Sequence, residues 1–587
     1  MLQAETVLCD VQIETSLEKL VETFSSPGFR GAFVELWVFD GLERRSRAAE
    51  VLNTRGVRAR VHAAYKPLVH AVNEELDRSD IDSVTIRYPV VEGISKTRFL
   101  LECYPVDILF KDVRLNFEPR KPVDGHQLIH YQLDVVRSDG SRELLEVGAP
   151  NVFRADHIGC SIYSAAGWIR VRFPGDEHFD RDEPFRTDQE FAFKAAMDAL
   201  SGQNWSGGGP YFDRLNMRVE APFYDDRLND GNERLSTAEA MHEDLYFSAL
   251  EVFRKCEGLD LEDRTLTPGQ LVPQIVPQEG PLRVRLSAAA GREPAFPAEP
   301  AVPERLEDVE HWLRPSAVKA HLERVGGEFI ETDSRRGRPI WSSYVDGPGP
   351  QVVITAGQHA NETTGPVGAL RAAQEMAKSG KNGFFVSPLV NPDGFALFRE
   401  LCGAYPEHMN HAARYTAAGC DLEYTSRGFE NEAHHIGREK TKSWLHLNLH
   451  GYPSHEWTRP YSGYVPRGVE MWTIPKGFFL ILRYWKGWKE QGERILHAII
   501  DELAGYQPII DLNSEQLQRY RQYTETPPFF VRSNVPYVSN EFAHGLFPVT
   551  IITEAPDETI YGSEFTINHT AQMISVLAAA KANVNLD

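Results

Sequence analysis

The fold of the second half of the chain is decided by one stretch, Gln351-Val-Val-Ile-Thr-Ala-Gly-Gln-His-Ala-Asn-Glu-Thr-Thr-Gly-Pro-Val-Gly368. It opens with a short apolar run bounded by turn residues, which is the pattern of a buried strand. The run breaks at Gly357, and after Gly365-Pro366 the apolar residues recur at helical spacing. His359 and Glu362 lie between the strand and the helix. Three residues apart on such a turn, they can reach one small ion, and they are two thirds of the His, His, Glu set typical of catalytic zinc.

The His-x-x-Glu spacing is weak evidence when it stands alone. A polar helix start explains it as well, because Glu362 would complement the positive end of the helix dipole. The chain contains 20 His residues but no other His-x-x-Glu. The features that follow it in the sequence therefore decide between a metal site and a helix start.

Length and composition indicate a folded protein of several domains. At 587 residues the chain is too long for one core, and two to four domains are expected. A net charge of -22 argues against a nucleic-acid or anionic-membrane partner, because either would favour a basic stripe. The start lacks the basic and apolar regions of a signal peptide, and the six cysteines are scattered. We expect a soluble cytoplasmic protein, and the sequence does not indicate its oligomeric state.

Residues 1–275 are predicted to form an α+β region, which could divide into two subdomains near 75–120. Strand-like patterns include residues 98–104, and helical patterns cover 188–200 and 236–256. The second helix begins with the capping-box spacing Ser-x-x-Glu. The sequence shows no catalytic constellation in this region, and its role stays open. His242 and Glu243, inside the second predicted helix, have no partner at ligand spacing and are interpreted as polar surface or core residues.

A change of composition divides the chain near its middle. Residues 276–305 are crowded with Pro and Ala and have little periodicity, which favours a semi-rigid linker. The remaining residues, 306–587, are enough for one α/β domain.

Three further strand-like runs in this second half each lead into polar residues. They end at Asn391-Pro-Asp-Gly394, at His450-Gly451 and at Glu554. In open, largely parallel sheets the functional crevice lies beyond the carboxyl ends of the strands. We therefore expect these residues and His359 to converge although they are far apart in the sequence.

On these motifs, residues 306 to about 580 resemble the M14 family of zinc metallocarboxypeptidases. The order and approximate spacing of the four motifs agree with the family. The resemblance implies a three-layer α/β/α domain with a mostly parallel mixed sheet. It also implies that His359, Glu362 and His450 bind one Zn²⁺ per chain and that Glu554 is the catalytic carboxylate.

The implied chemistry is consistent with these residue types. Three protein ligands leave zinc an open position for water, whose pKa falls toward neutrality, and the metal can polarise an amide carbonyl. Glu554 would take the proton from that water and pass it to the leaving nitrogen. The alternative for Glu554 is an exposed acidic residue at the end of a strand.

The sequence departs from the family where substrate would bind. Family members that release C-terminal residues carry an Asp-Leu-Asn-Arg stretch whose Asn and Arg hold the terminal carboxylate. The corresponding residues here, 421–424, read Asp-Leu-Glu-Tyr, and Glu423 would repel a carboxylate. The family's carbonyl-polarising Arg has no clear counterpart. Asn410, His411 or Arg414 could donate to an oxyanion, and Arg414 is our choice.

Two further assignments depend on position alone. The family's mobile Tyr could correspond to Tyr537, which we select, or to Tyr523. The polar stretch after the third ligand is expected to line the cleft, with His455 and Arg459 as substrate contacts or as structural residues. His446, on the same strand as His450, is interpreted as a packing residue near the metal.

Three functions remain open at this point. The first is a metallopeptidase resembling zinc carboxypeptidases, acting on a peptide. The second is a zinc amidase or deacylase of N-acyl amino acids or modified peptides, because the carboxylate anchor is altered. The third is a binding protein with a degenerate enzyme domain. Metal content separates the third from the other two, and the products formed separate the first from the second.

Overall fold

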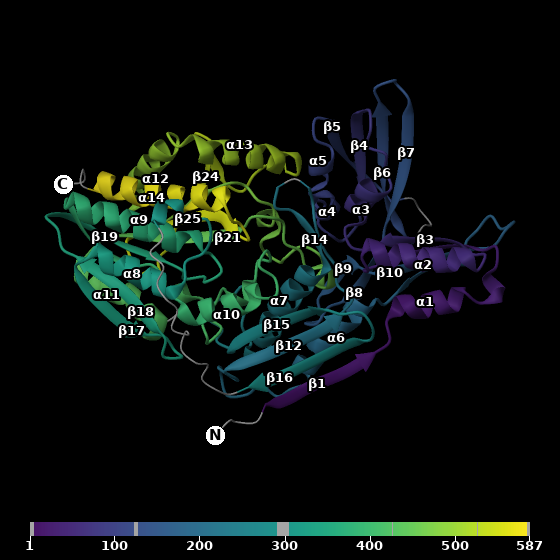
Figure 1. Ribbon diagram of the computed structural model, residues 1–587, viewed down its shortest axis with the longest axis horizontal. Helices are drawn as coiled ribbons and strands as arrows, with labels where there is room; N and C mark the ends of the chain where they lie inside the picture. Colours follow the sequence, from purple (N-terminus) through teal and green to yellow (C-terminus); the bar gives the residue numbers. More distant parts are fainter. Residues whose placement is uncertain are drawn as a thin grey trace.

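The computed structural model describes residues 5–122, 127–229, 231–289, 305–424, 427–524 and 526–583. Figure 1 shows the two halves of the chain side by side, with the first half in purple to teal and the second in teal through green to yellow. Strands from distant parts of the second half lie together in one large sheet.

That sheet has nine strands in the order β17-β18-β20-β19-β21-β25-β22-β24-β23. The strands β20, β19, β21 and β25 are parallel to one another, and β22 runs antiparallel to β25. The predicted mixed sheet is therefore confirmed, with four parallel and four antiparallel strand pairs. The strands are β17 (Glu328–Asp333), β18 (Pro339–Val345), β19 (Gly349–Ala356), β20 (Asn382–Ser387), β21 (Leu445–Pro453), β22 (Phe479–Tyr484), β23 (Phe530–Arg532), β24 (Val535–Glu541) and β25 (Val549–Glu558).

Helices cover both faces of this sheet, which gives the predicted three layers. On one face, a Cβ atom added at Gly365 in α9 would lie 3.2 Å from Cβ of Leu449. On the other face, the His434 ring of α11 lies 5.6 Å from that of His446. Leu449 and His446 point to opposite faces because side chains alternate along a strand. The helices of this half are α8 (Pro315–Val325), α9 (Thr364–Ser379), α10 (Pro392–Cys402), α11 (Glu432–Thr441), α12 (Lys489–Leu503), α13 (Gln507–Gln522) and α14 (Ser563–Asn583).

The first half combines several small sheets with helices, in agreement with the α+β prediction. Its four-stranded sheets have the orders β1-β16-β12-β15, β11-β10-β2-β3 and β5-β4-β6-β7. Among the described residues, no helix has both the length and the apolar composition needed to cross a membrane. The strands are β1 (Thr6–Ile13), β2 (Phe33–Val38), β3 (Arg58–Ala63), β4 (Ile81–Pro89), β5 (Arg114–Arg120), β6 (Ile129–Arg137), β7 (Arg142–Ala149), β8 (Asn151–Ala155), β9 (Ser161–Ala165), β10 (Gly167–Arg172), β11 (Arg181–Phe185), β12 (Arg214–Ala221), β13 (Asp225–Arg227), β14 (Arg234–Ser236), β15 (Gln270–Pro277) and β16 (Leu282–Ala289). The helices are α1 (Ser16–Phe24), α2 (Leu42–Thr54), α3 (Pro67–Glu74), α4 (Arg98–Cys103), α5 (Val106–Leu109), α6 (Asp188–Ser201) and α7 (Thr237–Glu257).

Two local predictions in the first half have different outcomes. The capping box is present, because the Ser236 hydroxyl accepts a hydrogen bond from the Glu239 backbone N–H at 3.1 Å. In contrast, residues 98–104 were predicted as a strand, and residues 98–103 form the helix α4. Apolar residues at positions 99, 101 and 103 give the alternation expected of a strand with one buried face. Most of α4 is buried on all sides, so this alternation does not indicate a strand. Periodicity alone cannot distinguish a strand from a short buried helix.

Part of the predicted linker is folded. Residues 282–289 form β16, which pairs with β1 from the start of the chain and with β12. The strands that pair with β16 are distant in sequence, so the local composition of residues 282–289 did not predict a strand. Residues 290–304, the rest of the predicted linker, lie outside the described residues. The division into domains at 1–275 and 306–587 stays a prediction.

The two halves share a continuous apolar core. The largest cluster of buried apolar side chains contains residues of both halves. For example, the Tyr461 ring of the second half stacks on Phe193 of α6, with ring centroids 5.9 Å apart. Phe39 of the first half lies 5.4 Å from the same ring. The halves therefore pack as one body at this contact.

The centre of the large sheet should be sensitive to loss of volume. Leu447 in β21 is fully buried, so Leu447→Ala should lower the free energy of unfolding by about 2–5 kcal/mol. Urea unfolding followed by circular dichroism measures this loss. Val531→Ala on the edge strand β23 is the control, because Val531 is 38% exposed and should change stability little. Equal effects of the two substitutions would contradict this assignment of the core.

Candidate metal centre

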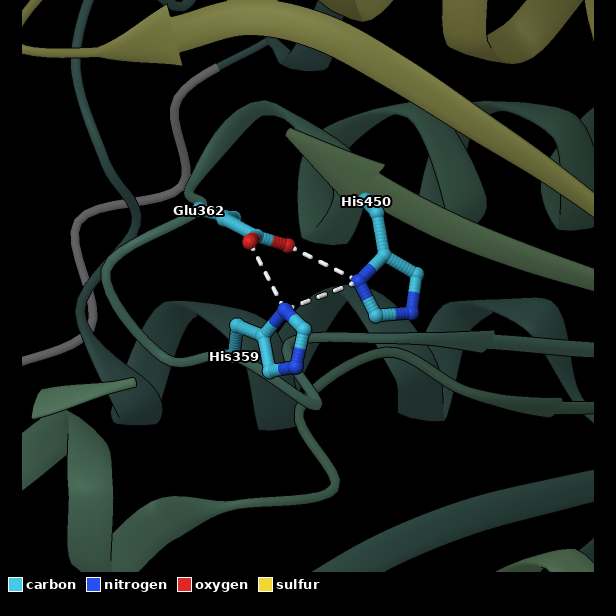
Figure 2. A group of neighbouring side chains, drawn as sticks. All are labelled: His359, Glu362 and His450. Carbon is cyan, nitrogen blue, oxygen red and sulfur yellow. Dashed lines mark hydrogen bonds and ion pairs between the residues drawn. The ribbon is translucent and has the colours of Figure 1, made fainter. Parts of the chain in front are cut away.

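Three side chains from two segments of the chain meet beyond the end of β19 (Figure 2). His359 follows β19, Glu362 precedes α9, and His450 lies in β21. All three are buried, with exposed fractions of 5%, 2% and 4%. Nδ1 of His359 lies 2.7 Å from Oε1 of Glu362, and Nδ1 of His450 lies 2.9 Å from Oε2 of the same carboxylate. The convergence predicted from the sequence is therefore present for these three residues.

The three donors fit a divalent cation. The two Nδ1 atoms lie 3.1 Å apart, and all the candidate ligand atoms lie within 4.8 Å of one another. Two nitrogens bound tetrahedrally at about 2.0–2.1 Å would be separated by about 3.3 Å. Without an ion, each ring can donate its Nδ1–H to one oxygen of Glu362, and a bound cation would take the place of these two protons. This donor set of two neutral nitrogens and one carboxylate is suited to zinc-like ions.

The surroundings of Glu362 explain the glycine that follows His450. The backbone N–H of Gly451 donates to Oε2 of Glu362 at 3.0 Å. A Cβ atom at position 451 would lie only 2.1 Å from Oδ1 of Asp557, so any other residue would displace that side chain. Asp557 in turn accepts hydrogen bonds from the backbone N–H and the hydroxyl of Thr364, at 2.9 and 2.5 Å, at the start of α9. These contacts lock the first turn of α9 against β21 and β25.

Asp421 is a neighbour of the metal centre that the sequence did not single out. Its Oδ1 lies 3.7 Å from Nε2 of His359 and accepts a hydrogen bond from Nε2 of Gln358 at 3.0 Å. A carboxylate at this place orients a ligating imidazole and increases its basicity. The signal in the sequence was its position at the start of the stretch that corresponds to Asp-Leu-Asn-Arg.

Glu554 lies beside the third ligand. It is the register partner of His450 on the neighbouring strand β25, so both side chains project from the same face of the sheet. Burial and the charge of Glu362 raise the pKa of Glu554 to about 8, against the opposing effects of His450, Arg414 and Lys476. A carboxyl group with such a pKa near neutral pH is suited to proton transfer.

Arg414 also reaches the centre, as selected from the sequence. Its Nη1 donates to Oε1 of Glu362 at 3.1 Å. His411 is nearby, with Nδ1 2.5 Å from Oε2 of Glu243 and Nε2 3.5 Å from Oε2 of Glu558. Asn410 is engaged by its own loop, because Nδ2 donates to the backbone oxygens of residues 405 and 408. Of these three candidates, Arg414 is the one in contact with a candidate ligand.

The structure does not bring His455, Arg459 or Tyr537 to the three ligands. Nε2 of His455 lies 2.9 Å from Oε2 of Glu239 in α7, and Arg459 donates to Glu251 in the same helix at 2.9 Å. Both side chains therefore join the two halves of the chain rather than face the ligands.

Tyr537 lies in β24, separated from β25 by β22, and its ring lies 6.4 Å from that of His497 in α12. The alternative, Tyr523, is fully buried and donates to Asp107 of the first half at 2.6 Å. Tyr523 directly follows α13 and lies outside the sheet, whereas Tyr537 lies within it, so spacing along the chain did not predict either position.

A cavity of about 240 Å³ is lined by residues close in sequence to the candidate ligands, but by none of the three ligands themselves. Its lining includes Gln358, Asn448, Glu423 and Arg483. Glu423 forms an ion pair with Arg483 of β22, so its negative charge is balanced. The predicted repulsion of a carboxylate by Glu423 is therefore weakened in the folded chain.

The family model described as zinc carboxypeptidase matches residues 328–467. This region contains His359, Glu362 and His450, whereas Glu554 lies beyond it. The second half of the chain is thus similar to zinc carboxypeptidases. No curated protein matches the chain.

The chain also matches several solved structures, at low identity. The metallo-carboxypeptidase from Burkholderia cenocepacia is 12% identical with a TM-score of 0.29, over 52% of this chain and 76% of that chain. The metallo-carboxypeptidase from Pseudomonas aeruginosa, solved with (2-guanidinoethylmercapto)succinic acid, is 15% identical with a TM-score of 0.29, over the same shares. An aspartoacylase family protein from Mesorhizobium loti is 15% identical with a TM-score of 0.24, over 44% of this chain and 68% of that chain. Likenesses at this level carry no argument about activity.

Metal analysis tests the three ligands directly. The wild-type chain should bind one zinc ion, and His359→Ala should lose it because two donors remain. Metal content after dialysis measures the stoichiometry. The matched control is His435→Ala, since His435 is a half-buried residue of α11 outside the group of candidate ligands. Equal zinc content in the wild type and His359→Ala would contradict the site.

The metal-free chain should show a pH-dependent stability that involves Glu554. Because its folded pKa is about 8 and its ordinary value is 4.5, the folded state holds a proton that the unfolded state releases between these pH values. The stabilisation of the folded state by this proton is fully present below about pH 4.5 and is lost as the pH rises through about 8. Glu554→Gln stays neutral, so the fall in thermal midpoint between about pH 5 and pH 8 should be smaller than in the wild type. Parallel profiles for the two proteins would show that Glu554 does not titrate in this way.

Proposed function

We propose that this chain is a zinc-dependent hydrolase of an amide or peptide bond, with Glu554 as the general base. The observation that carries the proposal is the buried group of His359, Glu362 and His450 with Glu554 as the strand neighbour of His450. The match of residues 328–467 to the zinc carboxypeptidase model supports the same class of reaction.

His359, Glu362 and His450 would hold the ion. Bound zinc would supply Lewis acidity toward a carbonyl and would lower the pKa of the attacking water. Glu554 would accept a proton from that water and deliver it to the leaving nitrogen, so that a poor leaving group departs as an amine. Asp421 would keep the His359 ring in one orientation through the ring nitrogen that faces away from Glu362.

Arg414 is the proposed partner of the negative charge that develops on the carbonyl oxygen. Its guanidinium lies at the centre and is positively charged at every relevant pH. A fixed cation at such a place stabilises the transition state more than the substrate. Its contact with Glu362 would hold the guanidinium in place before substrate binds.

Two substrate classes are compatible with this site. A peptide would be expected for a carboxypeptidase-like enzyme. The alternative is a small N-acyl amino acid or modified peptide, and two observations favour it. The candidate ligands are almost fully buried, and the position of the usual carboxylate-holding Asn is taken by Glu423 in an ion pair with Arg483. A binding protein with a degenerate enzyme domain would be the conclusion if purified chain neither contained nor took up zinc.

Glu554→Gln tests the catalytic proposal. The variant should retain zinc, because Glu554 is not a ligand, and should lose turnover by about 10²–10⁴-fold through loss of the proton carrier. Hydrolysis of free peptides, C-terminally amidated peptides and N-acyl amino acids should be measured side by side. The control is Glu541→Gln, an exposed residue of β24. Unchanged turnover in a zinc-loaded Glu554→Gln protein would refute the proposed role.

The same measurements separate the substrate classes. Release of C-terminal residues from unmodified peptides would identify a carboxypeptidase. Activity confined to acylated or amide-linked small substrates would identify an amidase or deacylase.

A further inference from the structure

Helix α7 of the first half lies against the loop that leads to Arg414. Glu239, His242 and Glu243 project from one side of α7, since residues three and four apart share a helix face. Their exposed fractions are 5%, 7% and 0%. Buried polar groups are costly unless they are hydrogen-bonded, so the partners of these three side chains show which segment α7 holds in place.

All three residues contact the short segment 409–412. Oε1 of Glu239 accepts a hydrogen bond from the Met409 backbone N–H at 2.8 Å. Nε2 of His242 accepts from the Ala412 backbone N–H at 3.4 Å. Oε2 of Glu243 lies 2.5 Å from Nδ1 of His411, which donates to it because an ionised carboxylate only accepts. One face of α7 therefore contacts three residues of the segment 409–412.

This turn leads directly to the metal centre. Residues 411–413 form a 3₁₀ turn, and the Arg414 backbone N–H donates to the His411 carbonyl at 2.9 Å. The guanidinium of Arg414 then donates to Glu362. Asn410, at the start of the turn, has a left-handed backbone with a φ of 51°. Asn adopts this conformation more readily than most residues, and the side chain of Asn410 stabilises the turn through the backbone oxygens of residues 405 and 408.

We propose that Glu243, with His242 and Glu239, positions Arg414 at the metal centre, so that the first half of the chain is a working part of the active site. The inference deepens the proposed hydrolase function and rests on it for the role of Arg414. The three residues of α7 touch neither the candidate ligands nor the reacting atoms, and they are therefore positioning residues. A displacement of about 1 Å at such a site can cost about 10²-fold in rate.

A double-mutant cycle tests whether Glu243 acts through Arg414. Glu243→Ala, Arg414→Ala and the double variant are compared for turnover and for the Kd of Zn²⁺ measured by chelator competition. Loss of a partner of a metal ligand typically weakens metal binding by about 10–100-fold. We expect the double variant to resemble Arg414→Ala alone, because residues that act as one unit are not additive. Glu243→Gln keeps an acceptor for Nδ1–H of His411 and should restore most of the loss.

Hydrogen exchange provides a readout that needs neither zinc nor substrate. In Glu243→Ala the backbone amides of the peptide covering residues 405–416 should exchange faster, because the anchor of the turn is removed. Circular dichroism and gel filtration confirm that the chain is folded. If Glu243→Ala does not fold, His242→Ala removes a separate contact of the same turn and takes its place in the cycle.

Two controls on the same helix separate positioning from general loosening. Glu257 contacts Tyr211 within the first half at 3.0 Å, and Glu257→Ala should change neither zinc affinity nor exchange of residues 405–416. Glu251 binds Arg459 of a different loop at 2.9 Å. Glu251→Ala should therefore have effects that add to those of Arg414→Ala.

Additive effects of Glu243→Ala and Arg414→Ala, or unchanged exchange of residues 405–416, would overturn the inference. A non-additive combination of Glu251→Ala with Arg414→Ala would also overturn the inference. The proposed function fails separately, if Glu554→Gln keeps full turnover. In that case faster exchange together with a non-additive zinc Kd would still establish that α7 positions Arg414.

Discussion

Three donor atoms that face a single point determine the arrangement of the second half of this protein. Two imidazole nitrogens lie 3.1 Å apart and one carboxylate faces both of them, so a single divalent cation can bind all three groups. The donors come from the end of β19, the approach to α9 and the interior of β21. They meet because four parallel strands bring their carboxyl ends to one edge of the sheet. A slip of one residue in β21 would turn His450 to the opposite face.

Close packing around Glu362 maintains this register. Gly451 gives the carboxylate a backbone donor and leaves room for Asp557, which holds the first turn of α9. Glu554 belongs to the same arrangement as the register partner of His450. Metal ligands, helix start and catalytic candidate are thus parts of one network rather than independent features.

Contacts between charged or polar side chains also join the two halves of the chain. Glu239, Glu243 and Glu251 of α7 are buried, and each contacts a His or Arg of the second half. A buried carboxylate without its partner costs several kcal/mol, so the halves are stable together only in the arrangement that completes these pairs. Glu239 and Glu243 also contact the segment 409–411, which leads to Arg414. The first half is therefore joined to the surroundings of the candidate metal centre by hydrogen bonds as well as by shared apolar surface.

The sequence by itself determined the mixed sheet, the order of its strand-end motifs and the candidate ligands His359, Glu362 and His450, because these depend on local patterns and short spacings. It could not determine the partners of His455 and Arg459, since Glu239 and Glu251 are about 200 residues earlier and no local pattern connects them. For the same reason it did not predict that residues 282–289 complete a sheet with β1. Only the tertiary structure decided these contacts, because pairing of buried charges and of sheet edges depends on which surfaces meet, and that is a property of the whole packed chain.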